Sequence, residues 1–394
     1  MGQRVVGIDV ARGVATLLML QTHAYHAWVA PELHGTVGYG ITRLLGTLPL
    51  PAFLLLAGAA VMLRVQLAAA HAIGNTPTDA PATRALRHEL ASRGLQVMAW
   101  GYAASAAYHV LDGGHGLSTL LRADVLHVIG LSIAVVSFTC LRSDRGNPDG
   151  NSIDPRRFAL RAAWLSVACV IAGPLINDLG QHVEGPARFL VALFVDVPGV
   201  TRMPLLPLLG WFGAGVVAAH VMQRARSHHP DSMRAAQAGA PDSTALRLAA
   251  MGLLLAVGGT WATPRLAAAL GGTFDRSHPA IYMNVIDLTG RALLLTGLCV
   301  WISTRLPAAL RSPLTRLGRG SLLVYVFHIP FCYGRFGDPL KGRLGLAEAS
   351  AWLLCLMAVS LGVVWLRDSL RRRMRGTASA ADSTDGAPLS PSST

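Results

Sequence analysis

Long apolar runs are the feature that most constrains what this chain can fold into. Runs of about twenty apolar residues, the length that an α-helix needs to cross the hydrocarbon of a bilayer, recur about ten times. Because lipid cannot hydrogen-bond an open backbone, we predict an all-α, polytopic membrane protein of about ten transmembrane helices. The runs cover approximately residues 12–30, 44–63, 94–111, 123–141, 158–177, 203–223, 247–270, 285–304, 318–334 and 346–366.

The composition excludes the main alternatives. Hydrophobic residues make up 52% of the chain and charged residues only 14%, with a mean hydropathy of +0.44. A soluble domain carries about 25% charged residues, so a soluble multidomain protein, a disordered chain and a disulfide scaffold are all excluded. The five cysteines lie inside apolar runs, and no Cys or His spacing typical of a metal site occurs. We therefore expect no metal.

The charge pattern predicts the topology. The net charge is +13, but most of the 34 Lys and Arg residues fall in alternate short loops, so we expect no nucleic-acid partner. This alternation favours cytoplasmic N- and C-termini, since basic loops stay inside. The stretch 185–198 is too short to span, and we interpret it as interfacial or re-entrant. Residues 371–394 end in a low-complexity sequence and are predicted to form a disordered cytoplasmic tail.

Ionisable side chains inside the runs are costly in lipid and are therefore functional candidates. At 1.5 Å per residue, His23 lies roughly 16 Å into its run and His328 roughly 15 Å into its own. Both depths are near the midplane of a hydrocarbon core of about 30 Å. Two histidines at the same depth on different helices can share one cavity.

A second group of polar residues lies near the predicted outer surface. Asp124 and His127 are spaced i, i+3, and Asp287 and Arg291 are spaced i, i+4. With His34, they suggest a polar vestibule that opens outward and has its floor at the midplane. The alternative for Asp287 and Arg291 is an ion pair that packs helices. For His26 and His109 the alternative is a structural or surface role, and the AGAA of residues 57–60 favours tight helix packing.

Four ordered motifs resemble one family. Residues 4–23, RVVGIDVARGVATLLMLQTH, resemble the opening of transmembrane acyltransferases. Three further stretches are similar to motifs of the heparan-α-glucosaminide N-acetyltransferase-like family: TRLLGTLPLPAFLLLAG at 42–58, DVLHVIGL at 124–131 and LGRGSLLVYVFH at 317–328. Because the motifs keep their order, we expect residues 1–370 to form one transmembrane acyltransferase-like domain.

The resemblance implies transfer of an acetyl or other acyl group from cytoplasmic acetyl-CoA to an amino or hydroxyl group of an extracytoplasmic sugar or glycan. The partners would be the acyl-CoA, the glycan acceptor and the bilayer, here the inner membrane of a bacterium. A homodimer is compatible with the sequence. Two alternatives stay open: an O-acyltransferase of the acyltransferase-3 type, and a non-catalytic transporter or flippase.

The resemblance also implies a catalytic histidine. Related O-acyltransferases place it at the position of His23, whereas the lysosomal enzyme's spacing leads to His34, and we rank His23 first. A histidine can accept a proton near neutral pH or carry the acetyl group itself, and both routes stay open. Arg12, Arg93 and Arg319 abut the inner ends of runs and could bind the CoA phosphates. The candidate catalytic set is His23, His34, His328, Asp124, His127, Asp287 and Arg291.

Overall fold

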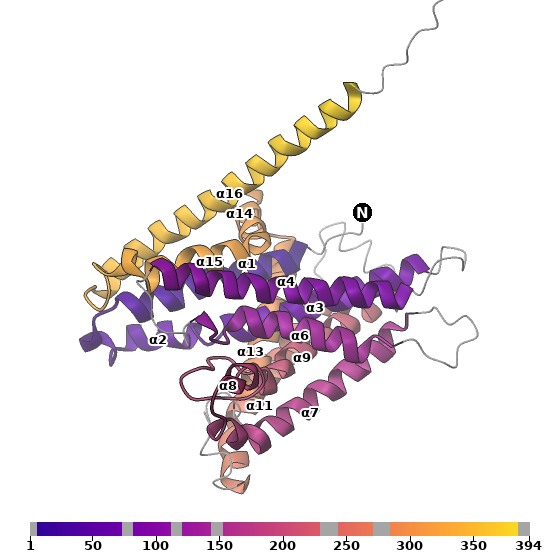
Figure 1. The fold of residues 1–394 in the computed structure, drawn as a ribbon, viewed down its shortest axis with the longest axis horizontal. Helices are drawn as coiled ribbons and strands as arrows, with labels where there is room; N and C mark the ends of the chain where they lie inside the picture. The colour runs from indigo at the N-terminus through magenta and orange to yellow at the C-terminus, as the bar shows by residue number, and fades with distance from the viewer. Residues whose placement is uncertain are drawn as a thin grey trace, which may run out of the picture.

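The computed structural model describes residues 6–72, 82–111, 120–142, 153–228, 243–270 and 284–384. Within these ranges the fold is all-α, with thirteen α-helices and two short 3₁₀ helices (Figure 1). The predicted all-α class is therefore confirmed for the described part of the chain. The helices are α1 (Val6–Trp28), α2 (Val37–Leu45), α3 (Pro49–Ala72), α4 (Ala82–Leu111), α6 (Val125–Cys140), α7 (Pro155–Gln181), α8 (Ala187–Val191), α9 (Leu205–His228), α11 (Ser243–Leu270), α13 (Val285–Ser303), α14 (Ala308–Arg319), α15 (Ser321–Cys332) and α16 (Leu346–Thr384), with η1 (Pro31–Leu33) and η3 (Arg335–Gly337).

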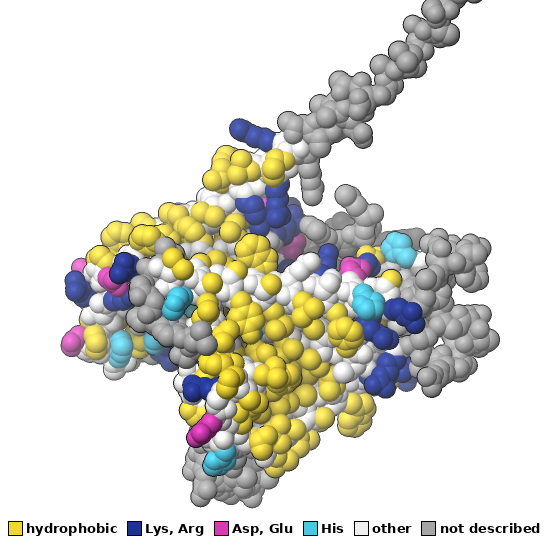
Figure 2. All heavy atoms as spheres, in the orientation of Figure 1, with side chains coloured by type: hydrophobic (Ala, Val, Ile, Leu, Met, Phe, Trp, Pro, Cys, Tyr) yellow, Lys and Arg dark blue, Asp and Glu magenta, His cyan; other side chains and the backbone are white. Residues whose placement is uncertain are grey.

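The helices indicate a multi-pass integral membrane protein. In the described part of the chain, five helical segments are long and apolar enough to cross a membrane. They are Val37–His71, Leu205–Ala225, Ser243–Arg265, Val285–Ser303 and Leu346–Met374. Two shorter apolar helices, α6 and α15, accompany them. Figure 2 shows a broad hydrophobic face in the middle of the molecule, with charged and histidine side chains gathered towards its two ends.

The helices around the centre of the molecule run side by side. Helices α4, α6 and α15 lie roughly along the long axis in Figure 1, whereas α16 leaves the bundle at an angle. Two isolated backbone bridges join loops at one end, Val29 to Leu344 and Ala123 to Thr201. These bridges matter for the site because residues 123 and 201 flank cavity residues described below.

The structure differs from the predicted runs at three places. The run at 318–334 is broken at Gly320, where α14 ends and α15 begins, and the backbone of that glycine (φ −97°, ψ 4°) leaves the helical region. The stretch 185–198 contains only the short helix α8, followed by a loop that packs on its own apolar side chains. Helix α16 continues to Thr384, so part of the predicted tail 371–394 is helical, since Arg, Met and Ala favour helix. Residues 385–394 lie outside the described ranges.

Small residues let α3 and α9 touch backbone to backbone. A Cβ added to Gly58 would lie 1.9 Å from the carbonyl oxygen of Phe212, and one added to Gly215 would lie 1.8 Å from that of Leu55. This contact lies within the predicted AGAA packing motif, and that prediction is confirmed. Close approach of this kind stabilises helix pairs in lipid, where dispersion contacts replace the hydrophobic effect.

We expect Gly58→Ala to lower the midpoint of thermal unfolding of the detergent-solubilised protein. The added methyl group meets a backbone oxygen that cannot rotate away, and overpacking of this kind costs about 1–3 kcal/mol. Gly362→Ala in α16 is the matched control, because a Cβ there meets no atom within 4 Å. Its midpoint should stay the same or rise, since alanine favours helix over glycine. Equal midpoints for the two variants would contradict the packing described here.

Candidate functional site

A cavity of about 520 Å³ lies between α1, α3, α4, α15 and the start of α6. Its apolar wall includes Met19, Phe53 and Met203. We call it the His23 cavity, because His23 is the histidine that lines it among the described residues. The other ionisable or polar side chains on its wall are Ser105, Tyr108, Arg122, Asp124, Arg202, Tyr325, Tyr333 and Lys341.

His23 takes part in a chain of polar contacts that leads out of the bundle. Its Nδ1 lies 2.9 Å from the hydroxyl oxygen of Tyr333. The same hydroxyl oxygen lies 3.4 Å from Nδ1 of His26, one turn further along α1. His23 is half-buried and His26 is exposed. The tyrosine therefore joins an imidazole on the cavity wall to one at the surface.

His328 stands directly beside His23. The two rings meet edge to face, with centroids 5.0 Å apart, so the two helices do bring these histidines together. His328 is fully buried but is not part of the cavity wall. Its Nδ1 donates to the carbonyl oxygen of Val324 at 3.1 Å, so its Nε2 is a bare acceptor. That Nε2 is buried and has no hydrogen-bond partner among the described residues.

Asp124 connects α6 to α15. One of its carboxylate oxygens accepts from the backbone N–H of Val125 at 2.7 Å and caps α6. The other accepts from the hydroxyl group of Tyr325 at 2.8 Å. Both Asp124 and Tyr325 face the His23 cavity. This carboxylate therefore fixes the cavity wall at the point where two helices meet.

His127 lies behind the cavity wall. Its Nδ1 accepts from the backbone N–H of Asp124 at 3.1 Å, which closes the capping box of α6. The buried ring packs edge-on against Tyr102 at 4.1 Å between centroids. It is separated from the cavity by Gly101, where an added Cβ would lie only 2.9 Å from the ring. These contacts indicate a structural role for His127, whose ring does not reach the cavity directly.

The remaining catalytic candidates lie elsewhere. His34 is exposed and stacks on Tyr39, with ring centroids 4.3 Å apart. Asp287 and Arg291 form an ion pair of 2.8 Å on α13, and Asp287 also accepts from Thr260 of α11. None of these three candidates lines the His23 cavity. The geometry of Asp287 and Arg291 fits the alternative of an ion pair that packs two helices.

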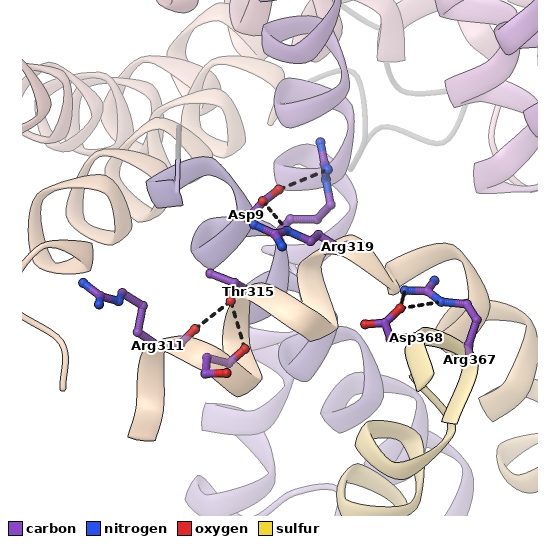
Figure 3. A network of polar contacts seen from close by, with 8 residues as sticks. Asp9, Arg311, Thr315, Arg319, Arg367 and Asp368 are labelled. Atoms are coloured by element: carbon purple, nitrogen blue, oxygen red, sulfur yellow. Dashed lines mark hydrogen bonds and ion pairs between the residues drawn. The ribbon is translucent and has the colours of Figure 1, made fainter. Parts of the chain in front are cut away.

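The three arginines predicted to bind CoA separate into two places. Arg12 and Arg319 converge on Asp9, at 3.9 and 2.9 Å, and Figure 3 shows the contact with Arg319. Arg93 instead lies 3.9 Å from Glu89, which pairs more closely with Arg64. None of the three lines the His23 cavity.

Several cavity residues were missed by the sequence reasoning. Tyr325 lies inside the motif at 317–328, but no functional role was predicted for it. Tyr333 lies just beyond the end of the same motif. Arg122, Arg202 and Lys341 were counted only as exceptions to the charge bias. Their position was a usable signal, because a basic residue in a predicted outer loop departs from the charge bias and is therefore a candidate for a functional role.

The pKa of Arg122 is shifted both by burial and by neighbouring charges. Burial lowers the pKa of the Arg122 guanidinium, Arg202 lowers it further, and Asp124 opposes both effects. The guanidinium still carries its charge at neutral pH, since its ordinary value is far above 7. This part of the cavity wall therefore carries positive charge, which Asp124 offsets in part.

The first part of the chain matches a known family. Residues 4–148 match the family model for heparan-alpha-glucosaminide N-acetyltransferase, catalytic. The resemblance based on the N-terminal motifs is thus confirmed over that stretch. It contains His23, Asp124 and Arg122, whereas α15 with His328 lies beyond it. No curated protein matches the chain. The match indicates an acetyltransferase of a membrane-embedded kind.

We expect Arg291→Leu to destabilise the protein strongly, because it leaves the buried carboxylate of Asp287 without its partner. Removing one member of a buried pair costs about 3–5 kcal/mol. Thermal unfolding in detergent should show the loss, and the double variant Asp287→Leu with Arg291→Leu should recover most of it. Specific activity of the folded double variant near that of the parent would support a packing role. A double variant that folds but has no activity would instead support a catalytic role for Asp287 and Arg291.

Proposed function

We propose that the protein is a membrane acetyltransferase that moves an acetyl group from acetyl-CoA to an amino or hydroxyl group of a sugar or glycan, with His23 as the general base. The observation that carries this proposal is that His23, within the family match, faces a cavity of about 520 Å³ whose wall also carries Asp124 and Arg122. We further propose that the chain crosses the inner membrane of a bacterium about ten times with both termini in the cytoplasm. The acceptor would then lie on the extracytoplasmic side.

The contacts of Tyr333 are compatible with a tautomer of His23 that suits this chemistry. A hydroxyl group has one proton, so Tyr333 can donate to only one of His23 and His26 and accepts from the other. If Nδ1 of His23 donates to Tyr333 and Tyr333 donates to His26, Nε2 of His23 is bare and can take a proton in the cavity. The same chain then carries the excess proton from His23 to the exposed His26.

The proposed reaction follows from this arrangement. The acceptor nitrogen or oxygen attacks the thioester carbonyl carbon while His23 takes its proton at Nε2. The carbon–sulfur bond breaks, and CoA leaves as a thiolate that takes up a proton. In the alternative route the carbonyl is first attacked by His23 itself, which gives a transient acetyl-histidine that the acceptor then opens. An acetylated protein trapped without acceptor would select the second route.

Neighbouring residues hold His23 and the cavity wall in place. His328 packs its ring against that of His23 from behind the cavity wall and so holds the His23 ring in place. Asp124 holds Tyr325 against the cavity, and His127 closes the cap beneath it. We propose positioning roles for these residues. For the donor, Arg12 and Arg319 around Asp9 remain the proposed phosphate ligands at the inner end.

We expect His23→Gln to reduce kcat for acetyl transfer by about 10²- to 10⁴-fold, the usual contribution of a general base. The measurement is transfer of labelled acetyl from acetyl-CoA to glucosamine by the purified protein in liposomes. His34→Gln is the matched control and should retain activity, since His34 is exposed and away from the cavity. Loss of activity in the control, with full activity in His23→Gln, would move the base to His34. Transport of an intact solute without acetyl-CoA consumption would reject the enzyme.

We expect Tyr333→Phe to lower kcat by about tenfold, the equivalent of one hydrogen bond, while KM for acetyl-CoA stays near its value in the parent. The variant keeps the ring and loses only the link between His23 and His26. Tyr39→Phe, whose ring stacks on His34, is the control and should behave like the parent. A solvent isotope effect that is present in the parent and changed in Tyr333→Phe would identify proton transfer. An unchanged kcat would contradict the proposed relay.

A further inference from the structure

Two arginines at the mouth of the His23 cavity are held together by the backbone. The N–H of Arg202 donates to the carbonyl oxygen of Ala123 at 3.1 Å, next to the bridge between Ala123 and Thr201. Arg122 directly precedes Ala123, so the segment before α9 is fastened to the segment before α6. Both side chains line the cavity. Their proximity therefore depends on the backbone and not on a chance side-chain conformation.

Neither guanidinium has a counter-ion in the described part of the chain. Nε of Arg122 is buried and lacks a hydrogen-bond partner. Arg202 is exposed, and no ion pair or side-chain hydrogen bond involves it among the residues that the structure describes. Two like charges facing one cavity repel each other, and a partly buried unpaired cation costs free energy. An anion placed between them would relieve both costs.

The single carboxylate on the cavity wall offsets only part of this positive charge. Asp124 is already engaged by Tyr325 and by the backbone N–H of Val125. Lys341, the third cation on the wall, is paired with Asp338 at 2.7 Å and with the carbonyl oxygen of Tyr333. With Lys341 paired, two arginine charges face the one carboxylate of Asp124, so the wall keeps a net positive charge.

We propose that Arg122 and Arg202 form an anion subsite that binds a phosphate, sulfate or carboxylate group of one of the reactants. Guanidinium groups bind such oxyanions through paired N–H donors, which fix orientation as well as charge. A reactant held there lies in the same cavity as His23 and Tyr325. The identity of the reactant rests on the proposed function, whereas binding of an oxyanion does not. Either an acidic sugar or the phosphates of acyl-CoA offer the required group.

Binding of inorganic sulfate tests the subsite without any reaction. At constant ionic strength, sodium sulfate should raise the thermal midpoint of the purified protein more than sodium chloride does. Arg202→Gln and Arg122→Gln should each weaken the apparent sulfate affinity by about tenfold or more. Arg202→Lys, which keeps the charge but not the fork, should fall between the parent and Arg202→Gln. Arg343→Gln is the control, because Arg343 is exposed and does not line the cavity.

Kinetics then distinguish the two sources of the anion. Glucosamine and glucosamine 6-sulfate form a matched neutral and charged pair of acceptors. If the acceptor uses the subsite, the sulfated sugar has the lower KM in the parent, and the ratio of the two KM values falls toward one in Arg202→Gln. If acyl-CoA uses it, Arg202→Gln raises KM for acetyl-CoA with both acceptors alike. Either result supports the subsite.

The inference and the proposed function fail in different ways. The anion subsite is overturned, even if acetyl transfer occurs, by either of two results. In the first, sulfate stabilises the parent no better than chloride does. In the second, sulfate stabilises Arg122→Gln and Arg202→Gln as well as it stabilises the parent. Sulfate binding that depends on both arginines, in a protein that transfers no acetyl group, would leave the subsite standing and reject the acetyltransferase.

Discussion

Hydrocarbon cannot solvate an imidazole, a carboxylate or a guanidinium, and this constraint decides where the polar side chains of the protein lie. Each buried polar group needs a partner from its own or a neighbouring helix. The carboxylate of Asp124 meets this need by joining the start of α6 to Tyr325 on α15. That of Asp287 meets it through Arg291 and through Thr260 on the adjacent α11. The same requirement that assembles the bundle also assembles the cavity.

The requirement is only partly met in the cavity wall and next to it. Nε of Arg122 on the wall and Nε2 of His328 behind it are buried without hydrogen-bond partners among the described residues. An unsatisfied group of this kind is costly, and on a cavity wall it is a place where a ligand can supply what the protein does not. His23 lies between the buried His328 and Tyr333, whose hydroxyl also contacts the exposed His26.

Much of the fold could be predicted from the sequence, because helix formation in lipid depends on local composition. Each apolar run falls mainly on helix, although those at 44–63 and 318–334 are each divided between two helices. The nearness of His23 and His328 agrees with simple counting, since helices rise by a fixed amount per residue. The break at Gly320 could not be predicted from the apolar run alone, which continues through that glycine.

The composition of the site was harder to predict. Depth and spacing find ionisable residues but do not show which way they face. His34 and His23 were both reasonable candidates, yet one stacks on Tyr39 at the surface and the other lines the cavity. Asp287 and Arg291 had the spacing of a functional pair and are occupied with each other. Tyr333 carried no signal at all, because a tyrosine near a helix end is ordinary in a membrane protein.

The shortness of α15 has a consequence for the size of any donor. The helix begins only two residues after Arg319, which is held by Asp9, and His328 follows within the same short helix. Within α15, His328 lies seven residues beyond Ser321, a helical rise of only about 10 Å. If Arg319 binds the phosphates of the donor, as proposed, the reactive carbonyl must lie on a slender arm that extends along this part of α15. This separation sets a minimum length for the donor. A compound whose headgroup and thioester lie closer together than Arg319 and His23 could not bind at Arg319 and react at His23.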